Sequence, residues 1–600
     1  MKQAAPKKEK PVMISKASII KEYGWTESLI KKYLPEPVFK PNPHYSTAPK
    51  MRLWPAALVE ATMQKATFQK DFAKIQEKRD KAQREKKQEA ERIHRLLLKN
   101  DLPAMLEKAK HMDRHFVLHC GPTNSGKTYQ SLEALKHAKT GVYLGPLRLL
   151  ALEVFDTLNS DGGPCNLLTG EEATMVPFAE VTASTIEMLD THAHYDVAVI
   201  DEAQLIADKD RGGAWTKALL CVDAKEVHVC FAPEALRFIE GIIKDIGASY
   251  ELVNHERLTP LVYSGNVKGL GSVEPGDAFI AFSRKTVLQI AALLEKKHNV
   301  KASVIYGALP PDSRRREVHR FETGETTVVV ATDAIGMGVS LPIRRIIFCN
   351  TQKYDGIQRR GLTTAEINQI AGRAGRYGKF DCGEVLVSGK SKLVKKRLGI
   401  PASPIAKVVV PFPKEITQED CGVPLKGLLL AWQALPDMKQ FVYEDMGNAI
   451  RLLEILEAEP TIKSRLKATP TSKIYEYITC PVDANKYELI QYWLNCCKAL
   501  LFHRCLPKPN AGMGSLEVCE IRYKQLDTLH QMGRRAGQEI DTRKERAEVC
   551  KQIDKFLTAD KSQYLRVCRR CGEELGFDNP YSLCEDCYAQ THFMYEDFPI

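Results

Sequence analysis

The 600-residue sequence has no run of about 18 consecutive apolar residues, the length that crosses a membrane as a helix. Its first ten residues, MKQAAPKKEK, lack both the apolar core of a secretory signal and the arginine-rich amphipathic character of a transit peptide. Its 17 cysteines are too few for a disulfide scaffold, which favours a reducing compartment. These absences predict an intracellular protein without a membrane-spanning part.

Neither sign of charge is in strong excess. Lys and Arg together number 86 and Asp and Glu 75, a formal net charge of +11, which fits a polyanionic partner without establishing one. The chain is too long for a single core, so we expect several domains.

A phosphate-binding loop is the strongest motif. Residues 121–128 read GPTNSGKT between a short apolar run and a helix-forming run, the setting of a P-loop. We expect Lys127 to reach the β- and γ-phosphates of ATP, and the Thr128 hydroxyl to hold Mg²⁺. An ordinary glycine turn is the alternative, which these flanks disfavour. The predicted nucleotide-binding residues of the loop are Gly121, Pro122, Thr123, Asn124, Ser125, Gly126, Lys127 and Thr128.

A second carboxylate motif follows the apolar run 195–200, which is a predicted strand. The residues after it are Asp201-Glu202-Ala203-Gln204. In a P-loop enzyme, Asp201 would hold Mg²⁺ and Glu202 would polarise the attacking water. An Asp-Glu pair alone is weak evidence, but its place after a strand downstream of the P-loop strengthens it.

The alternation of short apolar runs and helices from about residue 112 predicts parallel α/β sheets. A second such unit, with strands near 278–282, 303–306, 327–331 and 345–349, lacks a P-loop of its own. It carries QIAGRAGR from Gln369, in which Arg373 and Arg376 are three apart and would share a helix face. We interpret them as arginine fingers for the γ-phosphate in the first unit; a basic surface helix is the alternative.

The ends of the chain differ from this centre. Residues 13–62 predict two short helices, capped by Ser15 and Thr26, followed by a wing, an arrangement similar to MerR- and excisionase-type winged helix-turn-helix modules. A protein-docking module of that shape is equally compatible. Between residues 69 and 95, charges dominate and Gly and Pro are absent, which predicts a solvated connecting helix. Beyond residue 388 the pattern turns helical, with helices predicted near 425–435, 449–458 and 516–533.

Taken together, the motifs resemble those of superfamily-2 helicases, and most of all the RNA helicase of the mitochondrial RNA degradosome and its bacterial relatives. The ordered set, covering about residues 112–390, is GPTNSGKT, YLGPLRLLALEVF, LLTGEE, VTASTIEM, VIDEAQ, FSRK, VIYGALPP, ATDAIGMGVSLP and QIAGRAGR. The resemblance implies an ATP-dependent RNA helicase that acts in RNA turnover, with two RecA-like lobes closing on ATP.

By the same resemblance, specific residues acquire roles. The implied catalytic residues are Lys127, Asp201, Glu202, Gln369, Arg373 and Arg376. Asp333 and Gly336 would couple the nucleotide state to the grip on the strand. Residues in motifs that touch the nucleic-acid backbone in such helicases are Arg148, Thr169, Thr185, Ser283, Arg284 and Thr332; hydroxyls and arginines of this kind fix phosphates without reading bases.

The tail contains two C-x-x-C pairs, Cys568/Cys571 and Cys584/Cys587, separated by twelve residues. Four thiolates in two tight knuckles are the set that structural Zn²⁺ prefers. Disulfides are the alternative, disfavoured in a reducing compartment.

The expected architecture is therefore a multi-domain α/β protein with two RecA-like P-loop lobes, a winged-helix-like front module, a helical C-terminal domain and a small zinc-binding tail. The expected boundaries are 1–62, 63–111, 112–258, 259–390, 391–560 and 561–600. We expect ATP, Mg²⁺ and Zn²⁺ as cofactors, single-stranded or partly duplex RNA as substrate, a monomer, and an exoribonuclease as a protein partner. We expect a cytoplasmic, bacterial-type protein rather than a mitochondrial one.

Two other functions stay open on the sequence alone. A DNA-directed helicase or translocase would also suit the front module and the tail, because backbone contacts do not separate ribose from deoxyribose. A scaffold with a decayed ATP site is the third reading, and the intact Lys127, Asp201, Glu202 and Arg376 count against it.

Overall fold

The computed structural model describes residues 11–41, 49–99, 102–336, 341–418, 422–579 and 581–596. It divides into two compact units, Met1–Arg95 and Leu96–Ile600, each with its own core. Among the described helices, none is both long and apolar enough to span a bilayer.

The N-terminal unit pairs two capped helices with a small antiparallel sheet. Helices α1 (Lys16–Glu22) and α2 (Glu27–Tyr33) start at the predicted caps, since the Ser15 and Thr26 side chains accept hydrogen bonds from backbone N–H groups of the first turns. Gly24, at φ +71°, turns the chain between them. The sheet has the order β1-β3-β2, with strands β1 (Met13–Ser15), β2 (Val38–Lys40) and β3 (Met51–Pro55), and α3 (Ala56–Met63) follows.

The charged helix begins inside this core. Helix α4 spans Ala66–Lys99, and Phe68 near its start is 1% exposed, with its ring 4.3 Å from that of Trp25. The predicted connecting helix is present, and its first turns pack on the module: Phe68 lies just before the stretch 69–95 that we predicted as solvated, and Phe72, within that stretch, is half-buried. The middle of α4 is exposed, as its charges indicate.

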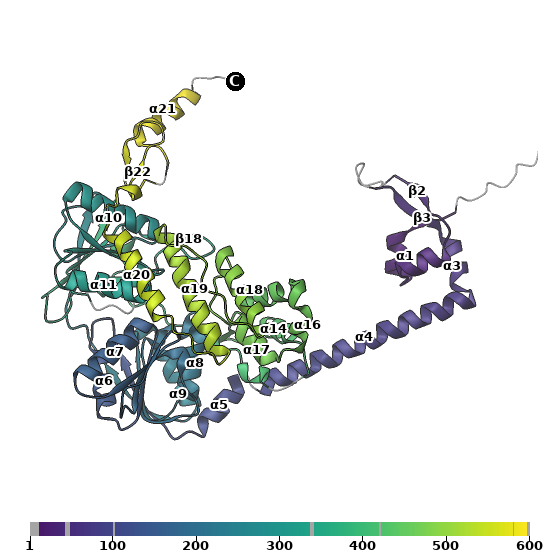
Figure 1. The fold of residues 1–600 in the computed structure, drawn as a ribbon, viewed down its shortest axis with the longest axis horizontal. Helices are drawn as coiled ribbons and strands as arrows, with labels where there is room; N and C mark the ends of the chain where they lie inside the picture. Colours follow the sequence, from purple (N-terminus) through teal and green to yellow (C-terminus); the bar gives the residue numbers. More distant parts are fainter. Residues whose placement is uncertain are drawn as a thin grey trace, which may run out of the picture. The chain divides into compact units, whose positions relative to one another are not determined.

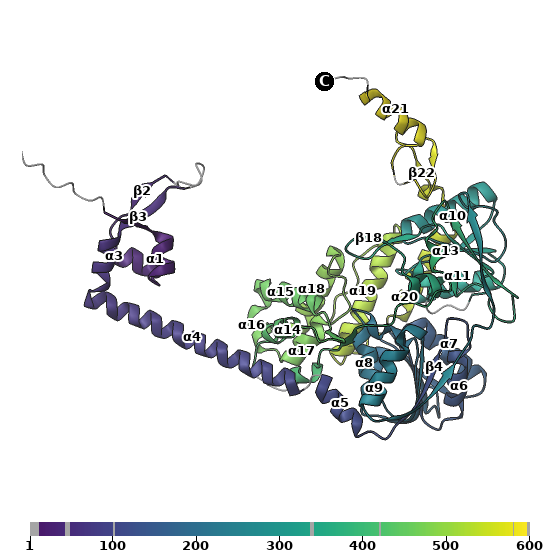
Figure 2. The ribbon, with the colours of Figure 1, turned by 180° about the vertical axis from the view of Figure 1, so that it is seen from behind.

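Lobe 1 is an eight-stranded sheet in which all neighbours are parallel except β6 and β7. Its order is β11-β4-β10-β9-β5-β8-β6-β7. The strands are β4 (His115–Cys120), β5 (Gly141–Gly145), β6 (Cys165–Leu168), β7 (Ala173–Thr174), β8 (Val181–Thr185), β9 (His194–Ile200), β10 (Asp223–Phe231) and β11 (Ser249–Asn254). Figure 2 shows the surrounding helices, which are α5 (Leu102–Lys110), α6 (Lys127–His137), α7 (Arg148–Ser160), α8 (Gly212–Cys221) and α9 (Leu236–Asp245).

Lobe 2 is a six-stranded, fully parallel sheet of order β12-β19-β16-β13-β15-β14. Its strands are β12 (Leu261–Val267), β13 (Asp277–Ile280), β14 (Ala302–Ile305), β15 (Val328–Ala331), β16 (Arg345–Phe348) and β19 (Gly383–Ser388). Its helices are α10 (Arg284–His298), α11 (Pro311–Glu322), α12 (Thr364–Ala371) and α13 (Leu393–Arg397), and a hairpin is formed by β17 (Gln352–Tyr354) and β18 (Arg359–Gly361). The prediction of two RecA-like lobes is confirmed, with predicted and observed strands agreeing within two residues.

The helical C-terminal part contacts both lobes. Helices α19 (Leu516–Arg535) and α20 (Arg543–Thr558) lie side by side and share a hydrophobic core with α10 of lobe 2 (Figure 1). Strand β20 (Val408–Val410), paired with β21 (Phe441–Tyr443), lies against α8 of lobe 1, where the Thr216 hydroxyl donates to the Val409 carbonyl over 2.6 Å. The other helices are α14 (Leu425–Gln433), α15 (Gly447–Ala458), α16 (Lys463–Ala468), α17 (Thr471–Ile478) and α18 (Tyr487–Leu501).

The tail consists of β22 (Arg566–Val567), β23 (Glu574–Leu575) and α21 (Glu585–Glu596). It docks on α10: the Gln289 side-chain amide donates to the buried Leu575 carbonyl over 3.1 Å, and Lys296 forms an ion pair with Glu574 at 2.7 Å.

Candidate active site

A cavity of ≈ 230 Å³ at the carboxyl edge of the lobe 1 sheet is lined by both lobes. The predicted residues that line it are Gly121, Thr123, Asn124, Ser125, Gly126, Lys127, Thr128, Asp201, Glu202, Arg373 and Arg376. Pro122 belongs to the same loop, where its carbonyl accepts a hydrogen bond from Lys127. The structure therefore brings the P-loop, the carboxylates and the arginines around one space.

The P-loop runs from β4 to α6 through two left-handed residues, Asn124 at φ +63° and Gly126 at φ +83°. Within the loop, Lys127 Nζ donates to the carbonyls of Gly121 at 2.8 Å and Pro122 at 2.6 Å. The ammonium group is thus held inside the curve of the loop, at the N-terminus of α6, where anionic phosphates are favoured.

A candidate magnesium site lies beside the loop. The Thr128 hydroxyl is 3.2 Å from Asp201 Oδ1, and the Tyr143 hydroxyl donates to Asp201 Oδ2 over 2.9 Å. Burial, together with the charge of Glu202, raises the pKa of the Asp201 carboxyl. A hard divalent cation offsets such a cost, and hydroxyl and carboxylate oxygens are its preferred ligands, so these two residues fit Mg²⁺.

Glu202 is held by Gln204, a residue with no role predicted from the motif. The Gln204 side-chain amide donates to Glu202 Oε2, and its oxygen accepts from the Ala232 N–H at the end of β10 over 3.1 Å. Gln204 thereby fixes the carboxylate relative to the sheet. Its place in the Asp-Glu-Ala-Gln motif was the available signal.

The arginines do not share a helix face. Helix α12 ends at Ala371, and Gly375, at φ +69°, cannot continue a right-handed helix, so Arg373 and Arg376 stand in an irregular segment. Arg373 Nη2 donates to the Gly336 carbonyl over 2.6 Å, and Arg376 lies 3.7 Å from Glu322. Both nevertheless line the cavity, because the segment crosses its lobe 2 wall.

Three other predicted residues lie behind this wall. Gln369 is on α12 and packs near Gly336, whose absent Cβ would lie 3.5 Å from Gln369 Cγ. Asp333 begins the short helix η4 (Asp333–Gly336) and pairs with Lys353 at 3.0 Å. Gln369, Asp333 and Gly336 are not among the residues that line the cavity. They would contact a nucleotide only after a movement of lobe 2.

Arg257 is a bridging residue that the sequence analysis missed. One guanidinium nitrogen donates to Thr123 O in the P-loop at 3.0 Å and to Gly372 O in lobe 2 at 2.9 Å, and the other donates to Ala374 O at 2.5 Å. Asn124 adds a second bridge, from its side-chain amide to Gly375 O at 2.9 Å. A lone arginine between two motifs offered no sequence signal for this role.

We expect Arg257→Gln to lower ATPase kcat by about ten- to a hundredfold, since the arginine segment and the P-loop lose their shared donor and a small misplacement is costly. Steady-state kinetics checks this, with Arg237→Gln on α9 as the control. A kcat within twofold of wild type would contradict the bridging role.

The six predicted nucleic-acid contacts all lie at or just after the carboxyl ends of parallel strands. The hydroxyl residues serve local structure: Ser283 caps α10 through the Thr286 N–H, and Thr169 accepts from the N–H of Glu172. Thr185 ends β8 and Thr332 follows β15, and both are buried. The two lobes thus present these polar residues at corresponding sheet edges.

The two predicted contact arginines are paired with carboxylates. Arg148 pairs with Glu171 at 2.5 Å and Glu172 at 2.7 Å. Arg284 pairs with Glu520 and, at 3.5 Å, with Glu517, both on α19. A phosphate would have to replace one of these partners to bind either guanidinium.

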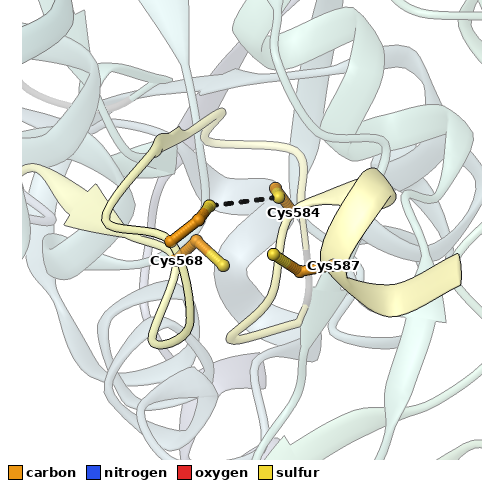
Figure 3. A group of neighbouring side chains, drawn as sticks. Cys568, Cys584 and Cys587 are labelled. Atoms are coloured by element: carbon orange, nitrogen blue, oxygen red, sulfur yellow. Dashed lines mark hydrogen bonds between the residues drawn. The ribbon is translucent and has the colours of Figure 1, made fainter. Parts of the chain in front are cut away.

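The four tail cysteines form a separate cluster. Their sulfur atoms all lie within 4.8 Å of one another, and the Cys571 and Cys584 sulfurs are 3.6 Å apart. Figure 3 shows the labelled side chains of Cys568, Cys584 and Cys587 converging. The second knuckle is tied to the first by Arg566, which donates to the carbonyls of Asn579 and Tyr581 at 2.5 and 2.6 Å.

Family models match both lobes. Residues 103–255 match the DEXQ-box helicase domain of Suv3, and residues 264–378 match the helicase conserved C-terminal domain. The chain carries a helicase core of the Suv3 type. The DEXQ box of that domain corresponds to Asp201-Glu202-Ala203-Gln204 here.

Curated relatives resemble this Suv3-type core. A mitochondrial DExH-box ATP-dependent RNA helicase, DExH16 of Arabidopsis thaliana, is 46% identical over 289 residues, 48% of this chain and 51% of that protein. The mitochondrial ATP-dependent RNA helicase SUV3 of Saccharomyces paradoxus is 37% identical over 455 residues, 69% of this chain and 60% of the relative. Rice SUV3L, also mitochondrial, is 46% identical over 276 residues, 45% of this chain and 38% of its own length.

These matches correct one expectation. The chain spans 38% to 60% of the lengths of these relatives, and each of the three is named as mitochondrial. The expectation of a cytoplasmic, bacterial-type protein is therefore wrong. It rested on an N-terminal composition without transit-peptide features, a weaker signal than the similarity of the core.

Proposed function

We propose that this protein is an ATP-dependent RNA helicase that unwinds or remodels RNA in RNA turnover. The observation that carries the proposal is the single cavity in which Lys127 and Thr128 of lobe 1 face Arg373 and Arg376 of lobe 2. ATP bound there would be held by one lobe and neutralised by the other, so that hydrolysis changes how the lobes close. The names of the similar relatives support the substrate class.

Each group in the cavity has a chemical task. Lys127 and the loop N–H groups bind the phosphates, and Asp201 with Thr128 holds Mg²⁺, which supplies charge neutralisation when bound. Glu202, oriented by Gln204, accepts a proton from the attacking water. Arg373 and Arg376 stabilise the charge that develops at the γ-phosphate, and Gln369, Asp333 and Gly336 transmit the closure through lobe 2.

RNA would cross the carboxyl edges of both sheets. Arg148, Thr169 and Thr185 in lobe 1 and Ser283, Arg284 and Thr332 in lobe 2 are our proposed backbone contacts, with phosphates exchanging for the carboxylates on Arg148 and Arg284. All groups of the ATP cavity come from one chain, which supports a functional monomer. An exoribonuclease partner would remove the strand that the helicase frees.

The test compares RNA with DNA of the same sequence. We expect single-stranded RNA to stimulate ATP hydrolysis, and a 3′-tailed RNA duplex to be unwound in the presence of ATP. Lys127→Ala should abolish both activities, and Lys139→Ala, outside the cavity, should keep them. Equal or greater stimulation by DNA would favour the alternative, a DNA-directed helicase, and hydrolysis by Lys127→Ala would place the ATP site elsewhere.

We also propose that the tail holds a structural zinc ion. The four sulfur atoms converge, and Gly572 at φ +77° forms a tight turn in the first knuckle. Four thiolates fill the tetrahedral shell of Zn²⁺, so no position stays open for catalysis.

Purified protein should therefore contain about one zinc per chain, the content of a single four-thiolate site. The double variant Cys568→Ser/Cys571→Ser should lose it, measured by elemental analysis, whereas Cys505→Ser, at an exposed cysteine outside the cluster, should retain it. A metal-free tail that resists proteolysis as well as wild type would contradict the proposal.

The N-terminal unit has the elements of a winged helix-turn-helix. Helices α1 and α2 meet at Gly24, and β2 with β3 forms an antiparallel pair in the position of a wing. We propose this module type on that basis, with nucleic acid or a protein as its ligand.

A further inference from the structure

Three histidines form a continuous hydrogen-bonded chain beside the P-loop. Strand β4, which lies between β10 and β11, supplies His119; His228 is on β10 and His255 follows β11. His119 Nδ1 lies 3.0 Å from His255 Nε2, and His119 Nε2 lies 2.9 Å from His228 Nδ1. The central ring is 1% exposed, so both of its nitrogens depend on these neighbours.

Both ends of the chain meet groups that only accept. His255 Nδ1 lies 3.3 Å from the carbonyl oxygen of Ser125 in the P-loop. His228 Nε2 lies 2.6 Å from Glu226 Oε1. A carbonyl oxygen and an ionised carboxylate offer lone pairs and no proton.

The number of protons on the three histidines therefore decides whether all four hydrogen bonds can form. The four contacts need four protons, one for each hydrogen bond. A neutral imidazole carries one N–H, so three neutral histidines supply three. The fourth bond forms only when the chain binds one additional proton, and the ionised Glu226 is the counter-charge at its end.

The surrounding charges place that proton. Burial, and then the charges of His228, His255 and Lys127, lowers the pKa of His119 to about 4. Burial likewise lowers the pKa of His255, with Lys127 on α6 adding to the effect. The other end of the histidine chain is its solvent-accessible end, since the Glu226 side chain is 42% exposed, and the Glu226 carboxylate is the counter-charge for the added proton.

The other titratable groups beside the three histidines do not supply the fourth proton. Glu251 of β11 is next to Val117 of β4 in the sheet, on an exposed position, and Cys230 of β10 pairs in register with His119. The Cys230 thiol contacts Ser131, and burial raises its pKa far above neutrality. Neither group forms a hydrogen bond with the three rings that would supply the fourth proton.

Without that proton, the bond to Ser125 is the one that opens. If His228 Nε2 carried no hydrogen, its lone pair would face a lone pair of Glu226 Oε1 at 2.6 Å, which is repulsive. The two hydrogen bonds of His119 are buried and so are costly to break. The contact of His255 with Ser125 is the longest of the four and lies in a half-buried position.

The segment at His255 also controls the loop directly. Its N–H donates to Cys120 O over 2.7 Å, and a Cβ on Gly121 would lie 2.5 Å from its carbonyl oxygen. A movement of His255 is therefore transmitted to both the beginning of the P-loop and Ser125.

We propose that His119, His228 and His255 are positioning residues for the P-loop, which a proton shared by His228 and Glu226 locks in its ATP-binding form. The inference rests on the proposed ATP site. Because the locked form needs the added proton, it predominates at low pH, and affinity for ATP falls as pH rises.

The test is the pH dependence of binding of a fluorescent ATP analogue with Mg²⁺ to the full-length chain, between about pH 6 and about pH 8.5, the range in which histidines titrate. Glu226→Gln is the decisive variant, because its amide supplies the fourth proton and completes the chain with neutral rings. We expect the rise in Kd across this range to be about threefold to about tenfold larger in wild type than in Glu226→Gln, the effect of about one hydrogen bond. Titration of the nucleotide itself is common to both proteins and cancels.

Glu251→Gln, the same change on β11 at the other side of β4, should keep the wild-type dependence. Ring-nitrogen NMR of the full-length protein labelled in histidine should show one of the three histidines gaining a proton in wild type and none in Glu226→Gln. Parallel pH profiles for wild type and Glu226→Gln would overturn the inference while leaving the ATP site in place. Absence of nucleotide binding by wild type at every pH would instead overturn the proposed function.

Discussion

Arg376→Ala should lower kcat for ATP hydrolysis by about a thousandfold or more, whereas the KM for ATP should change by only a few fold. An arginine that meets the γ-phosphate stabilises charge that appears only in the transition state, and such residues contribute factors of about 10³ to 10⁵. The measurement is steady-state ATPase activity with saturating RNA, together with nucleotide binding at equilibrium.

Two further variants sharpen this result. Arg376→Lys keeps the charge but loses the planar fork, so we expect it to remain well below wild type. Arg84→Ala, an exposed arginine of α4, should retain full activity and controls for loss of positive charge. If Arg376→Ala weakened ATP binding as strongly as it slowed turnover, the residue would act in ground-state binding rather than as a finger.

Glu202→Gln should lower kcat by about a hundredfold to about ten-thousandfold, the range for loss of a general base. The amide cannot take the proton of the attacking water, but it preserves the shape of the carboxylate and its contact with Gln204. ATP and RNA should therefore still bind, and the closed complex should accumulate.

The measurement combines single-turnover hydrolysis with RNA binding in the presence of ATP. Retention of RNA after a chase should be longer in Glu202→Gln than in wild type, and Glu256→Gln, at an exposed position, should behave as wild type. Unchanged turnover in Glu202→Gln would assign the proton transfer to another group.

The P-loop and the DEXQ box could be predicted from the sequence because each is local. A strand, a glycine-containing loop and a helix lie within a few residues of one another, and the chemistry of Lys127 or Asp201 follows from position alone. The capped helices at Ser15 and Thr26 and the parallel strands were predictable for the same reason: their signals are caps and periodicity of neighbouring residues.

Other features depend on the packing of distant segments. The three-residue spacing of Arg373 and Arg376 suggested a helix face, but Gly375 takes a left-handed conformation and the pair reaches the cavity from an irregular segment. The contacts of Arg148 and Arg284 with carboxylates likewise depend on loops and on α19, which no local pattern could have placed.

The sequence by itself determined which groups carry the chemistry: the lysine and hydroxyl of the loop, the paired carboxylates, the arginines and the four thiols. Only the tertiary structure decided how these groups are held, through Gln204 against Glu202, Arg257 across the lobes and the histidine chain under Ser125. Each of these supports joins residues that are neighbours across strands, turns or lobes, and a hydrogen bond depends on distance in space rather than on separation along the chain.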